Sequence, residues 1–437
     1  MTENENPIGF GIIGCAEIAR KVSRAIHLAP NATLVAVASR SIHKAKQFAV
    51  KNKLSDNVKL YGSYDELLDD PLVDAVYMPL PTSLHVKWAV IAARKGKHLL
   101  LEKPTALDVK MLDEMLEACE SNQLQFMDAS MWYHHPRTAK MKELLLNLEL
   151  FGHVKAIFGG FIKFQQLLIT GEYIHTGIGL MAFLRSASGA NLINLCLRCR
   201  GGIYMALGSP ISLAVEVSWV IPVGFMIHSS SSYHGTTQFL QNDIRVKPDL
   251  DALGALGDAG WYCIGAILWT MNQKLPTTVA ALPTTIRNSA GVILSCNAAL
   301  YWDEEQTVAT FYCSFVSHET MDLAVCGSNG TLHVEDFIIP YEENCATFSF
   351  TSGAKFVDMH IGWNVKPHEV QVATQLPQEG MMIQEFSRLV KGIKDLGLQP
   401  DTKWAQTSRV TQLVLDAVKN SIDNGYKAIQ MYGPNLD

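Results

Sequence analysis

The first 130 residues alternate between two hydrophobic periods, and this alternation constrains the fold more than any other feature. Uninterrupted apolar runs occur at residues 8–13, 33–38, 75–78, 98–101 and 124–127. Segments with helical spacing of apolar residues separate them, at 17–27, 41–51, 83–94 and 107–119. This pattern is typical of a parallel sheet covered by helices on both faces. We therefore expect a doubly wound α/β domain over residues 1–130, with ligands at the carboxyl ends of its strands.

The pattern changes after residue 130. Residues 136–146 predict a helix and residues 154–164 predict a strand. Further strands are predicted at 277–281, 291–300, 307–315, 320–326 and 331–335, and helices at 381–396 and 408–424. Consecutive strands joined by short turns favour antiparallel pairing. We therefore expect an α+β domain over residues 131–437, built on a large, mostly antiparallel sheet.

Residues 165–238 stand apart from the rest of the second domain. The segment contains five charged residues, shows no sustained helical or strand period, and ends close to a run of four serines. A structureless loop of this length is improbable inside a compact domain. We interpret the segment as an insertion. It is either a lineage-specific lid or translated non-coding sequence such as a retained intron.

Composition narrows the class of protein. The formal net charge of −6 gives no electrostatic basis for binding nucleic acid or an anionic membrane. The most apolar stretch, 203–227, is interrupted by two prolines and a glutamate, whereas a membrane span needs about 20 apolar residues. The first ten residues have the features of neither a secretory signal nor a transit peptide. We expect a cytoplasmic protein.

The nine cysteines form no recognisable metal or disulfide framework. One pair, Cys196 and Cys199, has C-x-x-C spacing, and no second pair or histidine cluster completes a zinc set. We interpret all nine as reduced thiols of an intracellular protein.

The turn after the first strand has the form of a phosphate-binding turn. The string Gly14-Cys15-Ala16-Glu17-Ile18-Ala19 connects this strand to the first helix. In this register Gly14 makes the tight turn, Ala16 lies where backbone approaches a pyrophosphate, and Ala19 lies where helix meets sheet. The helix N-terminus then offers amide hydrogens to phosphates. Because alanine replaces two of the three usual glycines, an ordinary βα turn is the alternative.

The end of the second strand indicates which dinucleotide would bind. NAD-binding sheets usually present a carboxylate there, which bonds the ribose 2′-hydroxyl. This chain has Ser39 and Arg40 instead, with Lys44 one turn later. A carboxylate would repel a 2′-phosphate, whereas these side chains would hydrogen-bond and neutralise it. The pattern favours NADP over NAD, with a solvated basic helix start as the alternative.

A lysine lies just beyond the predicted strand at 98–101. In Glu102-Lys103-Pro104 the lysine reaches the ligand edge of the sheet, and the proline restricts the turn that aims it. An amine at this edge is suited to proton transfer. Taken alone, Lys103 is better explained as an ordinary surface lysine than as a catalytic residue.

These motifs together resemble the Gfo/Idh/MocA family of oxidoreductases. The resemblance rests on Glu102-Lys103-Pro104 and on Pro81-Thr82-Ser83-Leu84-His85, although Thr82 replaces the asparagine of most members. A second block, residues 253–262, resembles the substrate-domain motif of the family, in which a glycine-rich turn precedes Asp258 and Tyr262. The resemblance covers residues 8–164 and 239–437. It is closest to the branch that contains dihydrodiol dehydrogenase and similar plant oxidoreductases.

The resemblance implies roles for individual residues. Lys103 would be the catalytic lysine, Tyr262 an acid/base or substrate-orienting residue, and Asp258 a residue that orients substrate or its neighbours. Trp132, His134 and Arg245 would line the substrate pocket together with Asp258. The cofactor-binding residues would be Gly14, Cys15, Ala16, Glu17, Ile18, Ser39, Arg40, Lys44, Leu80, Pro81, Thr82, His85, Glu102 and Lys103. We expect no metal, because adjacent histidine side chains on an extended loop diverge.

The implied activity is hydride transfer between NADP and a carbon of a sugar, polyol or diol, with Lys103 and Tyr262 sharing the proton transfer. Two alternatives have the same fold. One is a catalytically silent regulatory protein that senses NADP(H), and the other is a redox-neutral glycosidase that uses bound cofactor. We also expect a homo-oligomer, since an uncovered apolar face of the second sheet would need a partner.

Overall fold

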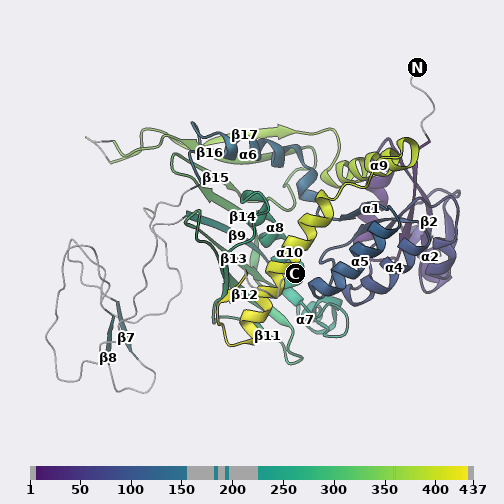
Figure 1. The fold of residues 1–437 in the computed structure, drawn as a ribbon, viewed down its shortest axis with the longest axis horizontal. Helices are drawn as coiled ribbons and strands as arrows, with labels where there is room; N and C mark the ends of the chain where they lie inside the picture. The colour runs from purple at the N-terminus through teal and green to yellow at the C-terminus, as the bar shows by residue number, and fades with distance from the viewer. Residues whose placement is uncertain are drawn as a thin grey trace. The chain divides into compact units, whose positions relative to one another are not determined.

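The computed structural model describes residues 6–154, 182–185, 192–195 and 225–431, apart from 358 and 360. The chain divides into two compact units, one formed by residues 1–157 with 222–437 and the other by residues 158–221. The second unit contains an antiparallel pair of short strands, β7 (Ala182–Arg185) and β8 (Leu192–Leu195). The first unit contains both large sheets (Figure 1). Residues 155–164 of the strand expected at 154–164 lie outside the described residues.

The N-terminal sheet confirms the predicted doubly wound domain. Six parallel strands have the order β3-β2-β1-β4-β5-β6. They are β1 (Ile8–Ile13), β2 (Ala32–Ala38), β3 (Lys59–Tyr61), β4 (Ala75–Met78), β5 (His98–Leu101) and β6 (Phe126–Asp128). Strands β1, β4 and β5 are buried along their whole length, which explains why their sequences show no polar alternation.

Helices cover both faces of this sheet. They are α1 (Glu17–Leu28), α2 (Ile42–Lys51), α3 (Tyr64–Leu68), the 3-10 turn η1 (Thr82–Leu84), α4 (His85–Arg94) and α5 (Val109–Ser121). Side chains that precede two of them cap free backbone amides. Ser63 accepts from the amide of Glu66 and Asp108 from that of Met111. Sequence reasoning missed β3 and α3, because both are too short to show a period.

The C-terminal sheet is large and mostly antiparallel, as predicted. Its strands have the order β17-β16-β15-β14-β9-β13-β12-β10-β18, with β11 paired to β12. They are β9 (Phe225–His234), β10 (Thr278–Ala281), β11 (Ile286–Arg287), β12 (Ile293–Trp302), β13 (Thr307–Ser314), β14 (Val316–Cys326), β15 (Gly330–Val334), β16 (Cys345–Ser352), β17 (His368–Ala373) and β18 (Ile429–Gln430). One pair, β9 with β13, is parallel.

Strand β9 corrects one boundary of the expected insertion. Residues 225–234 fall within the segment 165–238, yet they form a central strand between β14 and β13. The serine run at 229–232 hid the strand, because serine on both faces abolishes hydrophobic alternation. Ser230 Oγ donates to Thr320 Oγ1 at 3.0 Å and Ser229 Oγ to the carbonyl of Asp322 at 3.2 Å. Whether the remaining residues are an insertion stays a prediction.

The two faces of this sheet differ in chemistry. One face carries the buried side chains of Ile227, Phe311 and Leu323 and packs on α8 (Trp261–Thr270). The alternate positions carry polar side chains, among them Thr310 and Asp322, which are half-buried. The same face also carries apolar and aromatic side chains, among them Val308 and Tyr301, so the expectation of an uncovered apolar face stays a prediction. A homo-oligomer likewise stays a prediction.

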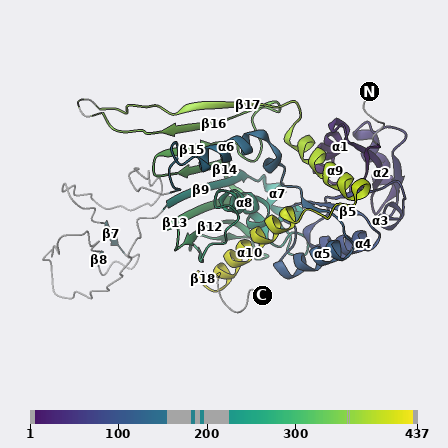
Figure 2. The ribbon, with the colours of Figure 1, turned by 45° about the horizontal axis from the view of Figure 1, so that its top comes forward.

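Two C-terminal helices connect the sheets. Helix α9 (Gln378–Leu396) packs along α1, and α10 (Lys403–Asp423) extends from α5 and β6 to β10 (Figures 1 and 2). Ser408 on α10 donates to Asp128 at the end of β6, and Arg409 forms two hydrogen bonds with Asp113 on α5, at 2.7 and 3.1 Å. Among the described residues, no helix is long and apolar enough to cross a membrane.

A buried ion pair fixes the start of α6 (Pro136–Leu146) to the large sheet. Arg137 is 1% exposed, and its Nη1 contacts Asp336 Oδ1 and donates to the carbonyl of Thr347 at 3.0 Å. Its Nη2 donates to the carbonyl of Asp336 at 2.9 Å. Because both charges are removed from water, neither is tolerated without the other.

We predict that Arg137→Met lowers the free energy of unfolding by about 3–5 kcal/mol, because the Asp336 carboxylate is left buried without its cation. Chemical denaturation measures this loss. The control is Arg388→Met, which removes an exposed ion pair with Glu385 and should cost less than about 1 kcal/mol. Equal losses in the two variants would contradict the structural role of the buried pair.

Candidate active site

Glu102 organises the turn that presents Lys103 at the end of β5. Tyr77 on β4 donates a hydrogen bond to Glu102 Oε1 at 2.5 Å, and the backbone amide of Lys103 donates to Oε2 at 3.1 Å. Burial raises the pKa of Glu102, and these hydrogen bonds partly oppose the increase. Pro104 follows through a cis peptide bond. The turn is thus held from inside the Rossmann sheet.

The side chain of Lys103 extends from this turn to the second domain. Its Nζ donates to Asp258 Oδ1 at 2.6 Å and to the backbone carbonyl of Asp258 at 3.0 Å. The same nitrogen lies 4.5 Å from the ring centroid of Tyr262. The lysine side chain is 10% exposed. The structure therefore brings together the three residues that the sequence assigned to catalysis.

Asp258 lies in a π-helical turn, η4 (Leu256–Gly260), which leads directly into α8. Such turns are rare and often occur at functional sites. Gly257 lets this turn approach the lysine turn closely. A Cβ on Gly257 would lie 2.6 Å from Leu253 Cβ and 3.1 Å from Pro104 Cγ. The glycine-rich segment before Asp258 thus serves close packing between the two domains.

Asp258 is held as a carboxylate by its neighbours. Its Oδ2 is 3.2 Å from Arg245 Nε and accepts a hydrogen bond from the Tyr233 hydroxyl at 3.2 Å. Burial by itself would raise the pKa of Asp258, but the charges of Lys103 and Arg245 outweigh burial and hold the pKa well below its usual value. Asp258 therefore orients its cationic neighbours and does not exchange protons near neutral pH.

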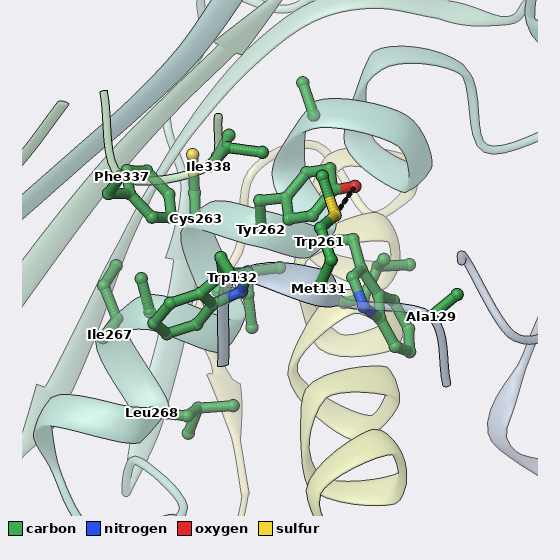
Figure 3. Close-up of a cluster of buried hydrophobic side chains, with 14 of the residues drawn as sticks. Ala129, Met131, Trp132, Trp261, Tyr262, Cys263, Ile267, Leu268, Phe337 and Ile338 are labelled. Atoms are coloured by element: carbon green, nitrogen blue, oxygen red, sulfur yellow. Dashed lines mark hydrogen bonds between the residues drawn. The ribbon is translucent and has the colours of Figure 1, made fainter. Parts of the chain in front are cut away.

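Tyr262 lies on the first turn of α8 and is 8% exposed. Its hydroxyl is directed at the sulfur of Met131, 3.6 Å away (Figure 3). Its ring faces the ammonium of Lys103. Burial raises the pKa of Tyr262 well above its usual value, with a further contribution from the carboxylate of Glu102. The phenol is therefore a proton donor, not a base, at neutral pH.

Arg245 lies in the 3-10 turn η3 (Ile244–Val246), at the more exposed side of the cluster. Its side chain is 37% exposed and contacts Asp243 Oδ1 at 3.1 Å as well as Asp258. The guanidinium thus has a free portion that could contact a substrate. That Arg245 lines a substrate pocket stays a prediction.

Two predicted substrate residues have packing roles instead. Trp132 is 1% exposed, and its indole stacks on Tyr133 and contacts the edges of Trp269 and Phe337 (Figure 3). His134 stacks on Trp404, with 4.6 Å between the ring centroids. Burial lowers the pKa of His134 to about 3, so this ring is neutral. Aromatic neighbours thus pack against both rings.

The end of β1 has the geometry of a phosphate-binding turn. Gly14 adopts a φ of +112°, and a Cβ there would lie 2.9 Å from Leu80 Cδ2, so glycine is required. The N-cap of α1 is Ala16, which has no side-chain acceptor for the free amides of the helix. These amides are available to an anion. Cys15 and Ile18 are half-buried, whereas Glu17 is exposed and pairs with Arg20.

A basic edge follows β2. Ser39 is 6% exposed, and its backbone amide donates to the carbonyl of Tyr61 at 3.2 Å. Arg40 and Lys44 are both exposed, before and within the first turn of α2. The structure thus places two cations and a hydroxyl near the edge where a dinucleotide ribose would lie in such a sheet.

The segment 79–85 has a more structural role than predicted. The imidazole of His85 is 1% exposed and bonds the carbonyls of Thr105 and Leu80, each at 2.9 Å. Both ring nitrogens are therefore occupied, so His85 shapes the turn and does not offer a donor to the cofactor. The amide of Thr82 donates to Asp251 Oδ1 at 2.7 Å, which links this segment to the chain before the π-helical turn. Leu80 is buried, and Pro81 and Glu102 are half-buried.

Sequence reasoning missed Tyr233. This residue lies on β9, within the segment interpreted as an insertion, so no pattern drew attention to it. The available signal was a tyrosine directly after the serine run, followed by Gly235 and the helix-capping Thr236. The structure shows that its hydroxyl contacts Asp258.

We predict that Gly257→Ala lowers the free energy of unfolding by about 1–3 kcal/mol, because the new methyl group overpacks the contact with Leu253 and Pro104. The control is Gly362→Ala, where a Cβ would meet nothing within 4 Å and the change should stay within about 0.5 kcal/mol. Thermal and chemical denaturation measure both. A neutral Gly257→Ala would show that the two turns are less tightly packed.

Comparisons with known proteins agree with this architecture. Residues 8–129 match the model of the oxidoreductase family with an NAD-binding Rossmann fold, and residues 224–333 match the GFO/IDH/MocA C-terminal domain. An uncharacterized oxidoreductase of Rhizobium meliloti is 41% identical over 157 residues, which are 36% of this chain and 46% of that protein. The dTDP-3,4-didehydro-2,6-dideoxy-alpha-D-glucose 3-reductase of Actinomadura kijaniata is 36% identical over 143 residues, 32% of this chain and 42% of that enzyme. The matches thus span less than half the length of these curated relatives.

Solved structures resemble the chain over almost its whole length. An aldose-aldose oxidoreductase from Caulobacter crescentus, complexed with glycerol, has a TM-score of 0.69 at 16% identity and covers 97% of this chain and 100% of its own. A 3-ketoreductase from Actinomadura kijaniata, in complex with NADP and TDP-benzene, has a TM-score of 0.64 at 22% identity, covering 95% and 98%. At these identities the likeness establishes the fold alone. With both family domains matched in order, the chain belongs to the Gfo/Idh/MocA family of oxidoreductases.

Proposed function

We propose that the chain is an NADP-dependent oxidoreductase that transfers a hydride between the nicotinamide and a CH–OH carbon of a sugar, polyol or diol. One observation carries the proposal. The ammonium of Lys103, from the ligand edge of the Rossmann sheet, is held against Asp258 and the ring of Tyr262 in the second domain. Relatives support the substrate class. They include an NADP-dependent D-xylose 1-dehydrogenase of Haloferax volcanii and an NADP-dependent scyllo-inositol 2-dehydrogenase of Bacillus subtilis.

The residues at the strand ends fit a dinucleotide. The left-handed Gly14 and the uncapped amides of α1 suit the pyrophosphate, since helix N-termini attract anions. Ser39, Arg40 and Lys44 suit a ribose 2′-phosphate, which a guanidinium can bind through two hydrogen bonds. Cys15, Ala16 and Ile18 would line the turn, and Leu80, Pro81, Thr82 and Glu102 would form the wall towards Lys103. These contacts favour NADP over NAD.

The chain itself supplies positioning and proton donors. When bound, the cofactor provides the hydride donor or acceptor. The buried phenol of Tyr262 is protonated at neutral pH, so it can donate to a substrate oxygen. The ammonium of Lys103 has three N–H bonds, two of which Asp258 engages, leaving the third for the same oxygen. Asp258 stays ionised and keeps this geometry.

The charges of the cluster favour a neutral substrate. Two cations, Lys103 and Arg245, are matched by two carboxylates, Asp243 and Asp258, within hydrogen-bonding distance. The half-buried Glu102 adds a third carboxyl group, which accepts a hydrogen bond from the backbone amide of Lys103. A phosphate or carboxylate substrate would find no unmatched positive charge among these residues, whereas hydroxyl groups could bond Arg245 and Lys103. A polyhydroxy compound therefore suits the site better than an acid.

We predict that the protein binds NADPH more tightly than NADH, and that Arg40→Asp narrows or reverses this preference. The loss of NADPH affinity should be roughly 10- to 100-fold, the value of one charge-assisted hydrogen bond. Fluorescence titration measures both affinities. Lys46→Asp is the control, since it makes the same charge change on an exposed position of α2. Equal affinities for the two cofactors in the unmodified protein would refute the NADP assignment.

We predict that Lys103→Met and Tyr262→Phe each reduce turnover by at least about 10²-fold, because each removes a proton donor. NADPH affinity should change little. Absorbance of NADPH with a panel of sugars, polyols and diols measures turnover in both directions. The control is Lys142→Met. Like Lys103, Lys142 is half-buried and faces an aromatic ring, in this case that of Trp269, but it lies outside the cluster.

Two outcomes would contradict the proposal. Undiminished turnover in Lys103→Met would remove the lysine from catalysis. Tight NADPH binding by the unmodified protein, without turnover on any substrate of the panel, would favour a regulatory protein that senses the cofactor.

A further inference from the structure

Tyr233 contacts the catalytic cluster from a strand that the activity does not otherwise require. It lies near the end of β9, and its hydroxyl donates to Asp258 Oδ2 at 3.2 Å. It has no contact with Lys103 or Tyr262 that would make it a proton donor to a substrate oxygen held between those two residues. Any effect of the hydroxyl on the reaction must therefore pass through Asp258.

The ring of Tyr233 is held rigidly. Phe315 lies 4.9 Å from it and Phe239 lies 5.3 Å from it in an edge-on arrangement, measured between ring centroids. A packed ring on a central strand has little freedom to move its hydroxyl. Burial raises the pKa of Tyr233, and the carboxylate of Asp258 raises it further. The hydroxyl therefore remains a hydrogen-bond donor throughout the usual pH range.

The two oxygens of Asp258 are held by different means. Oδ1 bonds Lys103, and Oδ2 bonds both Arg245 and Tyr233. Arg245 holds Oδ2 less firmly than Tyr233 does, because its side chain is 37% exposed and also bonds Asp243. It could turn towards Asp243 or towards a substrate. Such a movement would leave the hydrogen bond from Tyr233 to Asp258 in place.

We propose that Tyr233 is a positioning residue that fixes the carboxylate of Asp258 and, through it, the ammonium of Lys103 over the ring of Tyr262. Its hydroxyl allows Arg245 to engage substrate without releasing Asp258. The effect on turnover rests on the proposed oxidoreductase function, whereas the effect on the position of Lys103 does not. The two can be measured separately.

The first experiment is Tyr233→Phe, which removes one oxygen and keeps the packed ring. We expect kcat to fall about tenfold, less than the roughly 10²-fold loss that a 1 Å misplacement can cause. KM for the substrate and Kd for NADPH should stay within about twofold of the unmodified protein. The rising and falling parts of the pH profile of kcat should stay at the same pH, because the Tyr233 hydroxyl stays protonated. Tyr312→Phe is the matched control, since it removes a hydroxyl bonded to Ser317 in the same sheet.

The second experiment needs no turnover. Trinitrobenzenesulfonate modifies exposed amines, and mass spectrometry of peptides gives the rate at Lys103, with Lys142 as the internal reference. We expect the Lys103 rate to rise several-fold in Tyr233→Phe and to stay unchanged in Tyr312→Phe, because the loosened carboxylate releases the ammonium.

Three results would overturn the proposal. These are an unchanged labelling rate at Lys103, an equal change in Tyr312→Phe, and a displaced limb in the pH profile of Tyr233→Phe, which would make the tyrosine a proton-transfer residue. If the unmodified protein turns over no substrate, the oxidoreductase function fails, and the labelling rate still decides whether Tyr233 holds Asp258.

Discussion

The candidate site depends on an ion pair between the two domains, formed by Lys103 and Asp258. It requires a lysine at the end of a parallel strand and a carboxylate in a π-helical turn, 155 residues further along the chain. Both side chains are largely removed from water, so their attraction is screened less than that of a surface pair. A cofactor bound at the strand ends would lie beside this pair, because ligands of such sheets bind there.

The contacts around the ion pair hold Lys103 and Asp258 in place relative to each other. Glu102 holds the lysine turn from the Rossmann side, with Tyr77 bonding its carboxylate. Gly257 lets the π-helical turn approach Pro104 closely. Helix α10 connects the same two domains at a distance from the site, through Ser408 and Arg409. The geometry of the candidate site therefore rests on several contacts between the domains, of which the ion pair lies within the site itself.

Burial separates the candidate residues that could contact a substrate from those that only support the surrounding structure. Lys103 keeps its ammonium at Asp258 and over the ring of Tyr262. The hydroxyl of Tyr262 is directed at Met131, and Arg245 keeps part of its guanidinium exposed. Trp132, His134 and His85 resemble site residues in sequence, but the first two pack against aromatic rings and the third lies against two backbone carbonyls. Tyr233 shows the opposite relation between sequence and position. Its sequence context suggested nothing, and its hydroxyl contacts the central carboxylate.

The sequence by itself determined the doubly wound domain, the bounds of β1, β4, β5 and α6, the class of the second sheet, and the lysine, aspartate and tyrosine at the site. These follow from local periods, turn residues and short motifs, which act over a few neighbouring residues. Only the tertiary structure decided that β9 is a central strand and that Tyr233 and Arg245 share one oxygen of Asp258. Such features arise where distant segments pack together, so no local pattern encodes them.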